Sequence, residues 1–278
     1  LTGRHLLTNI FPFSFKEYLK FENKELTNTE TKEKLSKYLF NGGYPEILLK
    51  KVELKEYLSL LFNSILYKDI IKRYKIRNFK QIEDLATYLI SNIANEYSYN
   101  SLAKIGKIKS SHTIEKYLSY LEESFILFSL SRFSYKVKEQ LSSNKKIYCI
   151  DNGFIQAKSF KASPDLGKLY ENIVACKLKK QEVDEKIRLF YWKNQQQEEV
   201  DFVIKESLKV KQLIQICFNI DNLETKNREI RALIKAGKEL KCSDLLIITE
   251  DTEKEEKEEW FGDKATITYV PLWKWLLA

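Results

Sequence analysis

The chain has 278 residues and a formal net charge of +8, and 44% of its residues are apolar and 13% aromatic. This content suffices for folded domains and excludes a disordered chain. No apolar run approaches the roughly 18 residues of a membrane-spanning helix and no signal peptide is evident, so we expect a cytoplasmic protein without a membrane partner. Seven acids lie within residues 250–259, so the remainder is more basic still. The excess of positive charge favours a polyanionic partner such as DNA, or it reflects a lysine-rich composition alone.

The cysteines and histidines argue against several kinds of site. The four cysteines are far apart, form no C-x-x-C pair and lie in apolar runs, which favours buried thiols over zinc ligands or disulfides. With only His5 and His112, a histidine-rich metal site or a catalytic triad is excluded. None of the eight glycines opens a phosphate-binding loop, so we do not expect these residues to hydrolyse nucleotides by themselves.

Apolar spacing predicts a mostly helical region over residues 1–78. Pro12 suits the first turn of a helix, and further helices are expected near 31–40 and 54–65. The last of these ends in a basic, tyrosine-containing run at 67–75. That run either follows a phosphate backbone or forms an ordinary solvated helix face.

Residues 79–150 have the element order of a winged-helix domain, with three helices and then strands near 126–130 and 145–150 joined by a wing. In such a domain the third helix enters the major groove of DNA with its N-terminal residues leading. Basic and hydroxyl-bearing residues surround that end and are the candidate DNA contacts: Lys104, Lys107, Lys109, Ser111, His112 and Lys116. Glutamates on the same helix oppose DNA binding, and many winged helices contact proteins, so both interpretations stay open.

From residue 151 onward, alternating helices and strands predict a mixed-sheet α/β domain. The expected elements are a helix at 167–180, strands near 188–193, 199–204 and 210–217, a helix at 225–240, a strand at 245–249, an acidic loop, a strand at 265–270 and a closing helix at 272–277.

Two acids in this region are candidate site residues. Asp201 interrupts an apolar strand, where a carboxylate is costly unless it is paired, binds a cation or faces solvent. Glu171 lies beside the buried stripe of its helix. A helix acid, a strand acid and a third group near a strand end form the layout of a magnesium-dependent nuclease site. Arg228 and Glu229 could reach this site, or form a plain salt bridge on an exposed turn.

Together these features resemble the PD-(D/E)XK restriction-endonuclease-like fold found as a domain of unknown function behind the ATPase module of archaeal and bacterial AAA-type ATPases. Five stretches carry the resemblance: Leu1-Thr2-Gly3-Arg4, Pro12-Phe13-Ser14-Phe15-Lys16-Glu17-Tyr18, Gly42-Gly43-Tyr44-Pro45-Glu46, Tyr170-Glu171-Asn172 and Glu199-Val200-Asp201-Phe202. The resemblance implies three parts: an ATPase-lid and linker region (1–78), a winged helix (79–150) and a nuclease-like domain (151–278). Arg4 would be a nucleotide-sensing residue. The ATPase core would precede residue 1, so the chain would be a fragment, and ATP would bind only in that preceding part.

The third nuclease motif of this family, an acid, any residue and a lysine, is altered here. The matching positions hold Gln215 and Cys217. A glutamine oxygen is a weak Mg²⁺ ligand, and a cysteine lacks the ammonium that orients water and offsets phosphate charge. A competent site would hold Mg²⁺ through Glu171, Asp201 and Gln215, with Lys193 orienting water from the neighbouring strand. We expect weak or no cleavage, from a site that is either rearranged or inactive.

Two functions follow as expectations. In the first, the chain is a DNA-associated module of an AAA-type ATPase, contacting DNA, the ATPase domain and other subunits. In the alternative, it is a regulatory or protein-interaction module of a signal-responsive ATPase, and Glu171 and Asp201 are structural, paired with Arg228 or Lys193.

Overall fold

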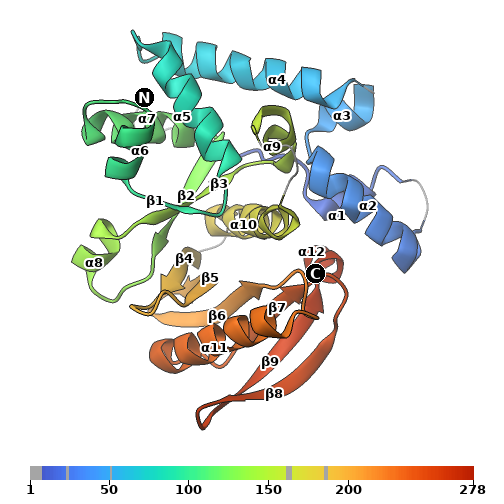
Figure 1. The fold of residues 1–278 in the computed structure, drawn as a ribbon. Coiled ribbons are helices and arrows are strands. Elements are labelled where there is room, and N and C mark those ends of the chain that lie inside the picture. The colour runs from blue at the N-terminus through green and yellow to red at the C-terminus, as the bar shows by residue number, and fades with distance from the viewer. Residues whose placement is uncertain (1–7, 23–24, 51, 161–164, 185–186) are drawn as a thin grey trace.

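The computed structural model describes residues 8–22, 25–50, 52–160, 165–184 and 187–278. Over these ranges the chain is a mixed α/β structure with one nine-stranded sheet of order β1-β3-β2-β4-β5-β6-β7-β9-β8 (Figure 1). The strands are β1 (Glu96–Tyr97), β2 (Leu127–Arg132), β3 (Lys145–Cys149), β4 (Ile187–Lys193), β5 (Glu199–Glu206), β6 (Lys209–Ile216), β7 (Leu245–Thr249), β8 (Lys254–Trp260) and β9 (Asp263–Pro271).

Helices surround this sheet. They are α1 (Phe15–Leu19), α2 (Asn28–Asn41), α3 (Pro45–Lys50), α4 (Leu54–Ser64) continued by the π-helix η1 (Ile65–Lys72), α5 (Phe79–Ser91), α6 (Tyr99–Ile105), α7 (Ser111–Glu123), α8 (Val137–Ser142), α9 (Asn152–Lys158), α10 (Leu166–Asp184), α11 (Leu223–Leu240) and α12 (Leu272–Leu277). None of the helices in the described ranges has the length and apolar character needed to cross a membrane.

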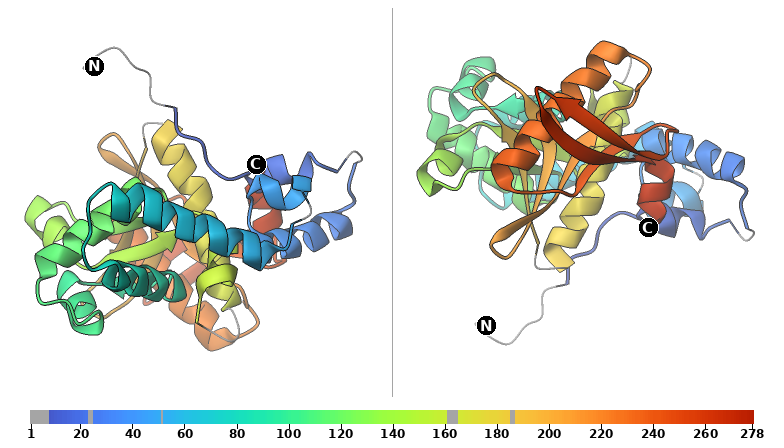
Figure 2. Two further views of the ribbon diagram at one scale, coloured as in Figure 1. Left: turned by 90° about the horizontal axis from the view of Figure 1, so that it is seen from above. Right: turned by 90° about the horizontal axis from the view of Figure 1, so that it is seen from below.

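Alternating side chains of the central strands pack into two separate cores. On β6, Ile214 belongs to the larger core, which includes α10, and its neighbour Leu213 to a smaller core with α11. Ile248 and Ile247 on β7 divide in the same way. Successive residues of a strand point to opposite faces, so the sheet is covered on both sides, by α10 on one and α11 on the other. Figure 2 shows the sheet between these two helices from two further directions.

The predicted strands and helices of residues 79–150 are confirmed as elements. The order α5, β1, α6, α7, β2, α8, β3 ends in an antiparallel sheet in which β3 lies between β1 and β2. The segment between β2 and β3 that was predicted as a wing contains the short helix α8. This small sheet joins the larger one through a parallel pairing of β2 with β4, at Ser131↔Phe190 and Arg132↔Tyr191. The joint is short, with one further bond from the Phe133 N–H to the Tyr191 carbonyl at 2.7 Å.

Two local predictions were wrong. The first helix does not begin at Pro12: Ser14 caps α1 by accepting a hydrogen bond from the Glu17 N–H at 3.3 Å, while the Glu17 carboxylate accepts one from the Ser14 N–H at 2.8 Å. This capping box fixes the helix start after the proline. The acidic segment predicted as a loop is largely strand β8, antiparallel to β9. Its inward acids Glu256 and Glu258 pair with Lys226 of α11 at 3.3 and 3.2 Å, which offsets their charge.

Buried polar groups tie the N-terminal helices to the end of β3. The Asp151 carboxylate accepts hydrogen bonds from the backbone N–H groups of Gly43 at 2.7 Å and Gly153 at 2.8 Å. Gly42, with φ +73°, lies so close that a Cβ there would be 1.8 Å from the Asp151 Oδ1. Burial raises the pKa of Asp151 to about 7. The backbone of Gly42 and Gly43 therefore packs closely against the turn at Asp151.

Candidate functional site

The structure gathers three carboxylates around one buried ammonium, that of Lys146. Its Nζ lies 2.7 Å from Glu171, 2.7 Å from Glu199 and 3.1 Å from Asp201. The lysine comes from β3, Glu171 from α10 and the other two acids from β5. Only 2% of the lysine is exposed. Glu171 and Asp201, the two acids predicted as site residues, are thus brought together, and the buried cation between them is Lys146.

Strand alternation and one asparagine position this arrangement. Lys146 and Tyr148 are two residues apart on β3 and face the same side. The Tyr148 hydroxyl donates to the same Glu171 oxygen as the lysine, at 2.6 Å. Asn172, next to Glu171 on α10, accepts from the Cys149 N–H at 2.9 Å and donates to the Cys149 carbonyl at 2.8 Å. These paired bonds fix α10 against β3 and so align Glu171 with Lys146.

Gln215, at the first position of the altered third nuclease motif, is connected to Asp201 through a separate hydrogen-bond network. The Gln215 Oε1 accepts a hydrogen bond from the Asp201 N–H at 3.1 Å, and its Nε2 donates to Glu229 at 2.7 Å. Asp201 also accepts from the Ile216 N–H through Oδ2 at 3.0 Å. At the end of this hydrogen-bonded network, the Arg228 guanidinium forms an ion pair with Glu229 at 2.6 Å. The Arg228–Glu229 pair is therefore a salt bridge, and its glutamate also reaches the site.

The cluster contains more acids than cations. Lys193 pairs with Glu96 and lies 3.6 Å from Glu199. In the ion pairs that the described residues form in this network, three cations (Lys146, Lys193 and Arg228) face five carboxylates (Glu96, Glu171, Glu199, Asp201 and Glu229). Burial, with the Asp201 charge second, raises the pKa values of Glu171 and Glu229 to about 7. Each of these two acids therefore binds a proton readily near neutral pH, which offsets the excess of two carboxylates.

Lys146 keeps its charge despite its burial. Burial alone would lower its pKa, but the surrounding acids, with Glu171 the strongest, outweigh that effect and raise the pKa well above the usual value. A buried ammonium is tolerated where opposite charges and hydrogen bonds surround it.

A polar cleft of about 580 Å³ opens beside the cluster. Its lining includes Glu171, Glu199, Asp201, Gln215 and Glu229. Mg²⁺ needs several oxygen ligands at about 2.0–2.1 Å in near-octahedral geometry. Here the inward oxygens of Glu171 and Asp201 already contact Lys146, and the Gln215 oxygen accepts the Asp201 N–H. No group of three or more candidate ligand side chains is arranged for a metal within the described ranges. The residues as placed do not fit the Mg²⁺ expected from the nuclease resemblance.

The remaining residues singled out from the sequence lie at the edge of the cluster or away from it. Lys193 is at the edge: among the described ion pairs it contacts Glu96 and Glu199 and not Glu171 or Asp201. Arg4 lies outside the described residues. The candidate DNA contacts are all exposed around the start of α7: Lys104, Lys107, Lys109, Ser111, His112 and Lys116.

Sequence reasoning missed Lys146, Tyr148 and the role of Glu199. One signal was available: in the strand at 145–149, Lys146 and Tyr148 alternate with the apolar Ile147 and Cys149. Polar residues on one face of a strand that is otherwise buried indicate a polar partner. The partner could not be identified, because β3 and β5 are far apart in sequence and two strands, β2 and β4, separate them in the sheet.

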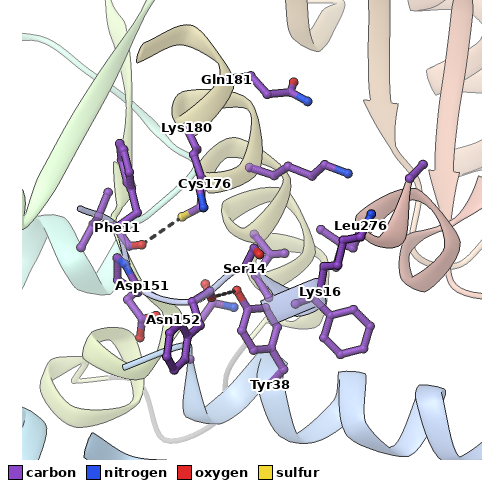
Figure 3. Close-up of a pocket in the computed structure, with 18 residues that line it drawn as sticks. Phe11, Ser14, Lys16, Tyr38, Asp151, Asn152, Cys176, Lys180, Gln181 and Leu276 are labelled. Carbon is purple, nitrogen blue, oxygen red and sulfur yellow. Dashed lines mark hydrogen bonds between the residues drawn. The ribbon is translucent and has the colours of Figure 1, made fainter. Parts of the chain in front are cut away.

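A second cavity, of about 230 Å³, lies between α1, α10 and α12. Figure 3 shows its lining, with Tyr38 and Asn152 near Ser14 and with Cys176 and Lys180 on α10. The Tyr38 hydroxyl donates to the Phe13 carbonyl at 2.7 Å and the Cys176 thiol to the Ile150 carbonyl at 3.3 Å. None of the acids around Lys146 lines this mainly apolar cavity. It is therefore separate from the candidate site.

Comparison with known proteins shows that two different domain families match this chain. The boundary between the two matched segments falls between Lys146 and the three acids that surround it. Residues 32–164, which include Lys146, match a domain of unknown function, DUF8612, and residues 166–275, which include the acids around it, match a second one, DUF4143. The uncharacterized protein MJ1544 of Methanocaldococcus jannaschii is 40% identical over 296 residues, covering 100% of this chain and 64% of the relative. An uncharacterized protein of Haemophilus influenzae is 30% identical over 183 residues, covering 64% of this chain and 46% of the relative. The chain thus spans less than two thirds of either curated relative and is similar to two domain families of unknown function.

Proposed function

We propose that this chain is a DNA-associated module of a longer ATPase-linked protein, with a winged helix at 79–150 and a nuclease-like domain at 151–278 that does not cleave DNA through Mg²⁺. The observation that best supports DNA binding is the exposed, basic surface around the N-terminal end of α7. Lysines from α6, the following turn and α7 itself are exposed there, beside the hydroxyl of Ser111. Lysines and hydroxyls are the groups that contact phosphates in protein–DNA complexes.

Further support comes from the order of the elements. Three helices precede an antiparallel sheet centred on β3, and β1 lies between the first two helices, which agrees with the element order expected of a winged helix. In the proposed domain the third helix, α7, would enter the major groove. The length of MJ1544 beyond the aligned part leaves room for an ATPase domain.

The absence of cleavage is supported by the altered site. Gln215 and Cys217 stand where the nuclease motif has an acid and a lysine, and Lys146 contacts both remaining acids. We expect no nicking of supercoiled DNA in Mg²⁺ or Mn²⁺. Nicking that disappears in Asp201→Ala would contradict this part of the proposal.

DNA binding is tested by the salt dependence of the affinity for a short duplex. Release of counterions makes log K fall linearly with log salt concentration, and each lost phosphate contact reduces the slope by about 1. We expect Lys107→Ala/Lys109→Ala to weaken binding about ten-fold at low salt and to flatten the slope. Lys50→Ala/Lys55→Ala removes the same charge from exposed positions outside the winged helix. Equal losses in both double variants would indicate nonspecific attraction only.

The alternative is a regulatory module that binds protein, and one observation favours it. Glu171 and Asp201 are ion-paired, as structural acids would be, although with Lys146 instead of Arg228 or Lys193. If duplex affinity is undetectable at low salt, this alternative becomes the better account of the α7 surface.

A further inference from the structure

We propose that Lys146 is a built-in counter-cation that takes the place of a divalent metal among the nuclease-like acids, so that the lysine and a metal compete for the same carboxylates. The inference rests on the proposed function only for the kind of metal, a hard divalent cation. Its test measures metal binding and needs no DNA.

The geometry around the ammonium is that of a cation bound by oxygens. Oxygens from Glu171, Glu199 and Asp201 converge on one nitrogen from a helix and a strand, at 2.7–3.1 Å. An ammonium has three N–H donors. It donates hydrogen bonds to Glu171 and Asp201, and Glu199 forms a third ion pair with it. The lysine side chain therefore supplies its positive charge at the point where the acids converge.

Two of these carboxylates also accept hydrogen bonds from groups other than Lys146. The Glu171 oxygen that contacts Lys146 accepts a second bond, from Tyr148 at 2.6 Å. The other Asp201 oxygen accepts the Ile216 N–H at 3.0 Å. A metal that took these same oxygens as ligands would have to displace the ammonium or break these bonds, because hard cations need direct oxygen ligands.

Each acid has a support other than the ammonium. Asn172 holds α10 to the backbone of β3 through Cys149, and Asp201 is held to β6 through the Ile216 N–H, so we expect both acids to keep their positions when Lys146 is replaced. Without the lysine, excess negative charge would lie beside the polar cleft, which gives a cation access. The cluster would then select a small, hard divalent cation such as Mn²⁺ or Mg²⁺.

The experiment follows the thermal unfolding of the full chain in Mn²⁺, with Mg²⁺ in parallel, and calorimetric titration of the same samples. The wild type and Asp201→Asn should respond identically to Mn²⁺. Lys146→Met, of similar shape without the charge, should bind Mn²⁺ at least ten-fold more tightly than the wild type. Its Tm should rise by about 5 °C or more at a hundred-fold excess over Kd. Lys145→Met, the adjacent lysine outside the cluster, is the matched control and should gain no binding.

A charge-balanced variant covers the case in which Lys146→Met does not fold. Lys146→Met/Glu199→Gln removes one positive and one negative charge together and keeps Glu171 and Asp201. It should also gain Mn²⁺ binding. Failure of either folded variant to gain binding would overturn the proposal. Mn²⁺ stabilisation of the wild type that is lost in Asp201→Asn would overturn it as well, since the acids would then hold a metal with the lysine in place.

Discussion

The ammonium of Lys146 on β3 lies 3.1 Å from the carboxylate of Asp201 on β5, although β2 and β4 lie between these strands in the sheet. The contact is possible because the lysine side chain is long and because β2 and β4 pair only at Ser131–Arg132. It joins the segment matched by one domain family to the segment matched by the other. The cluster is therefore a property of both segments together.

Replacing Lys146 by methionine should lower the free energy of unfolding by about 3–5 kcal/mol in the absence of metal. The reason is that removing one partner of a buried ion pair leaves uncompensated buried charge. Chemical denaturation measures the loss. A double-mutant cycle with Glu171→Gln should show coupling of more than about 1 kcal/mol, because the two residues are in direct contact. Additive effects would mean that the pair contributes nothing beyond its separate residues.

Replacing Gln215 by glutamate would restore the acid of the nuclease motif at a structural cost. The new carboxylate would face Glu229, which now accepts a hydrogen bond from the Gln215 amide at 2.7 Å. We expect a loss of about 1–3 kcal/mol at pH 8, since a hydrogen bond is replaced by repulsion between two acids. The loss should shrink in Gln215→Glu/Glu229→Gln, which exchanges donor and acceptor. A loss that persists in this double variant would place its cause elsewhere.

Stability should fall as pH rises from about 4.5 to about 7. Burial raises the pKa values of Asp151, Glu171 and Glu229 to about 7 in the folded protein, so over this range the folded state binds more protons than the unfolded state. Under that condition the free energy of unfolding decreases with pH. In Glu171→Gln the decrease between pH 4.5 and 8 should be smaller, by an amount on the order of 3 kcal/mol. Identical pH profiles for the two proteins would show that Glu171 titrates normally.

Replacing Gly42 by alanine should destabilise the protein much more than replacing Gly262. Both glycines have positive φ, at +73° and +84°, so both substitutions introduce the same kind of backbone strain. Only at Gly42 would the new Cβ also collide with Asp151, whereas nothing lies within 4 Å at Gly262. We expect Gly42→Ala to lose at least about 2 kcal/mol more than Gly262→Ala in denaturant unfolding. Similar losses would mean that the turn moves to relieve the clash.

Local patterns predicted most elements of the fold. The buried strand β7 at 245–249 and the hairpin of β4 and β5 follow from short β-branched runs and a polar turn, and both are present. The start of α1 and the strand β8 were not predicted, for different reasons. A capping box at Ser14 outweighed the proline signal, and a lysine from α11 made an acidic segment compatible with a strand. A tertiary contact thus determined that the acidic segment forms strand β8.

The site was predicted in part. The sequence predicted that Glu171 and Asp201 converge, with Mg²⁺ as their common partner; the structure brings them together around a different partner, Lys146. The identity of that partner depends on the pairing of β2 with β4 and on the reach of one side chain from a distant strand. Neither leaves a periodic signal in the sequence. Lys193 was the lysine expected nearest to the acids, because adjacent strands are simple to infer and remote ones are not.

The strand order also separates positive and negative side chains between the two ends of the sheet. The helices α6 and α7 lie at the β1-β3-β2 end of the sheet, and β8 is its opposite edge (Figure 1). Exposed lysines, Lys104 and Lys116, lie on these helices, whereas β8 is rich in glutamate. If the chain binds DNA as we propose, these charges would attract the duplex at one end of the sheet and repel it at the other, and would favour one orientation before close contact. The duplex would then lie away from β8 and leave that acidic edge accessible to a basic neighbour.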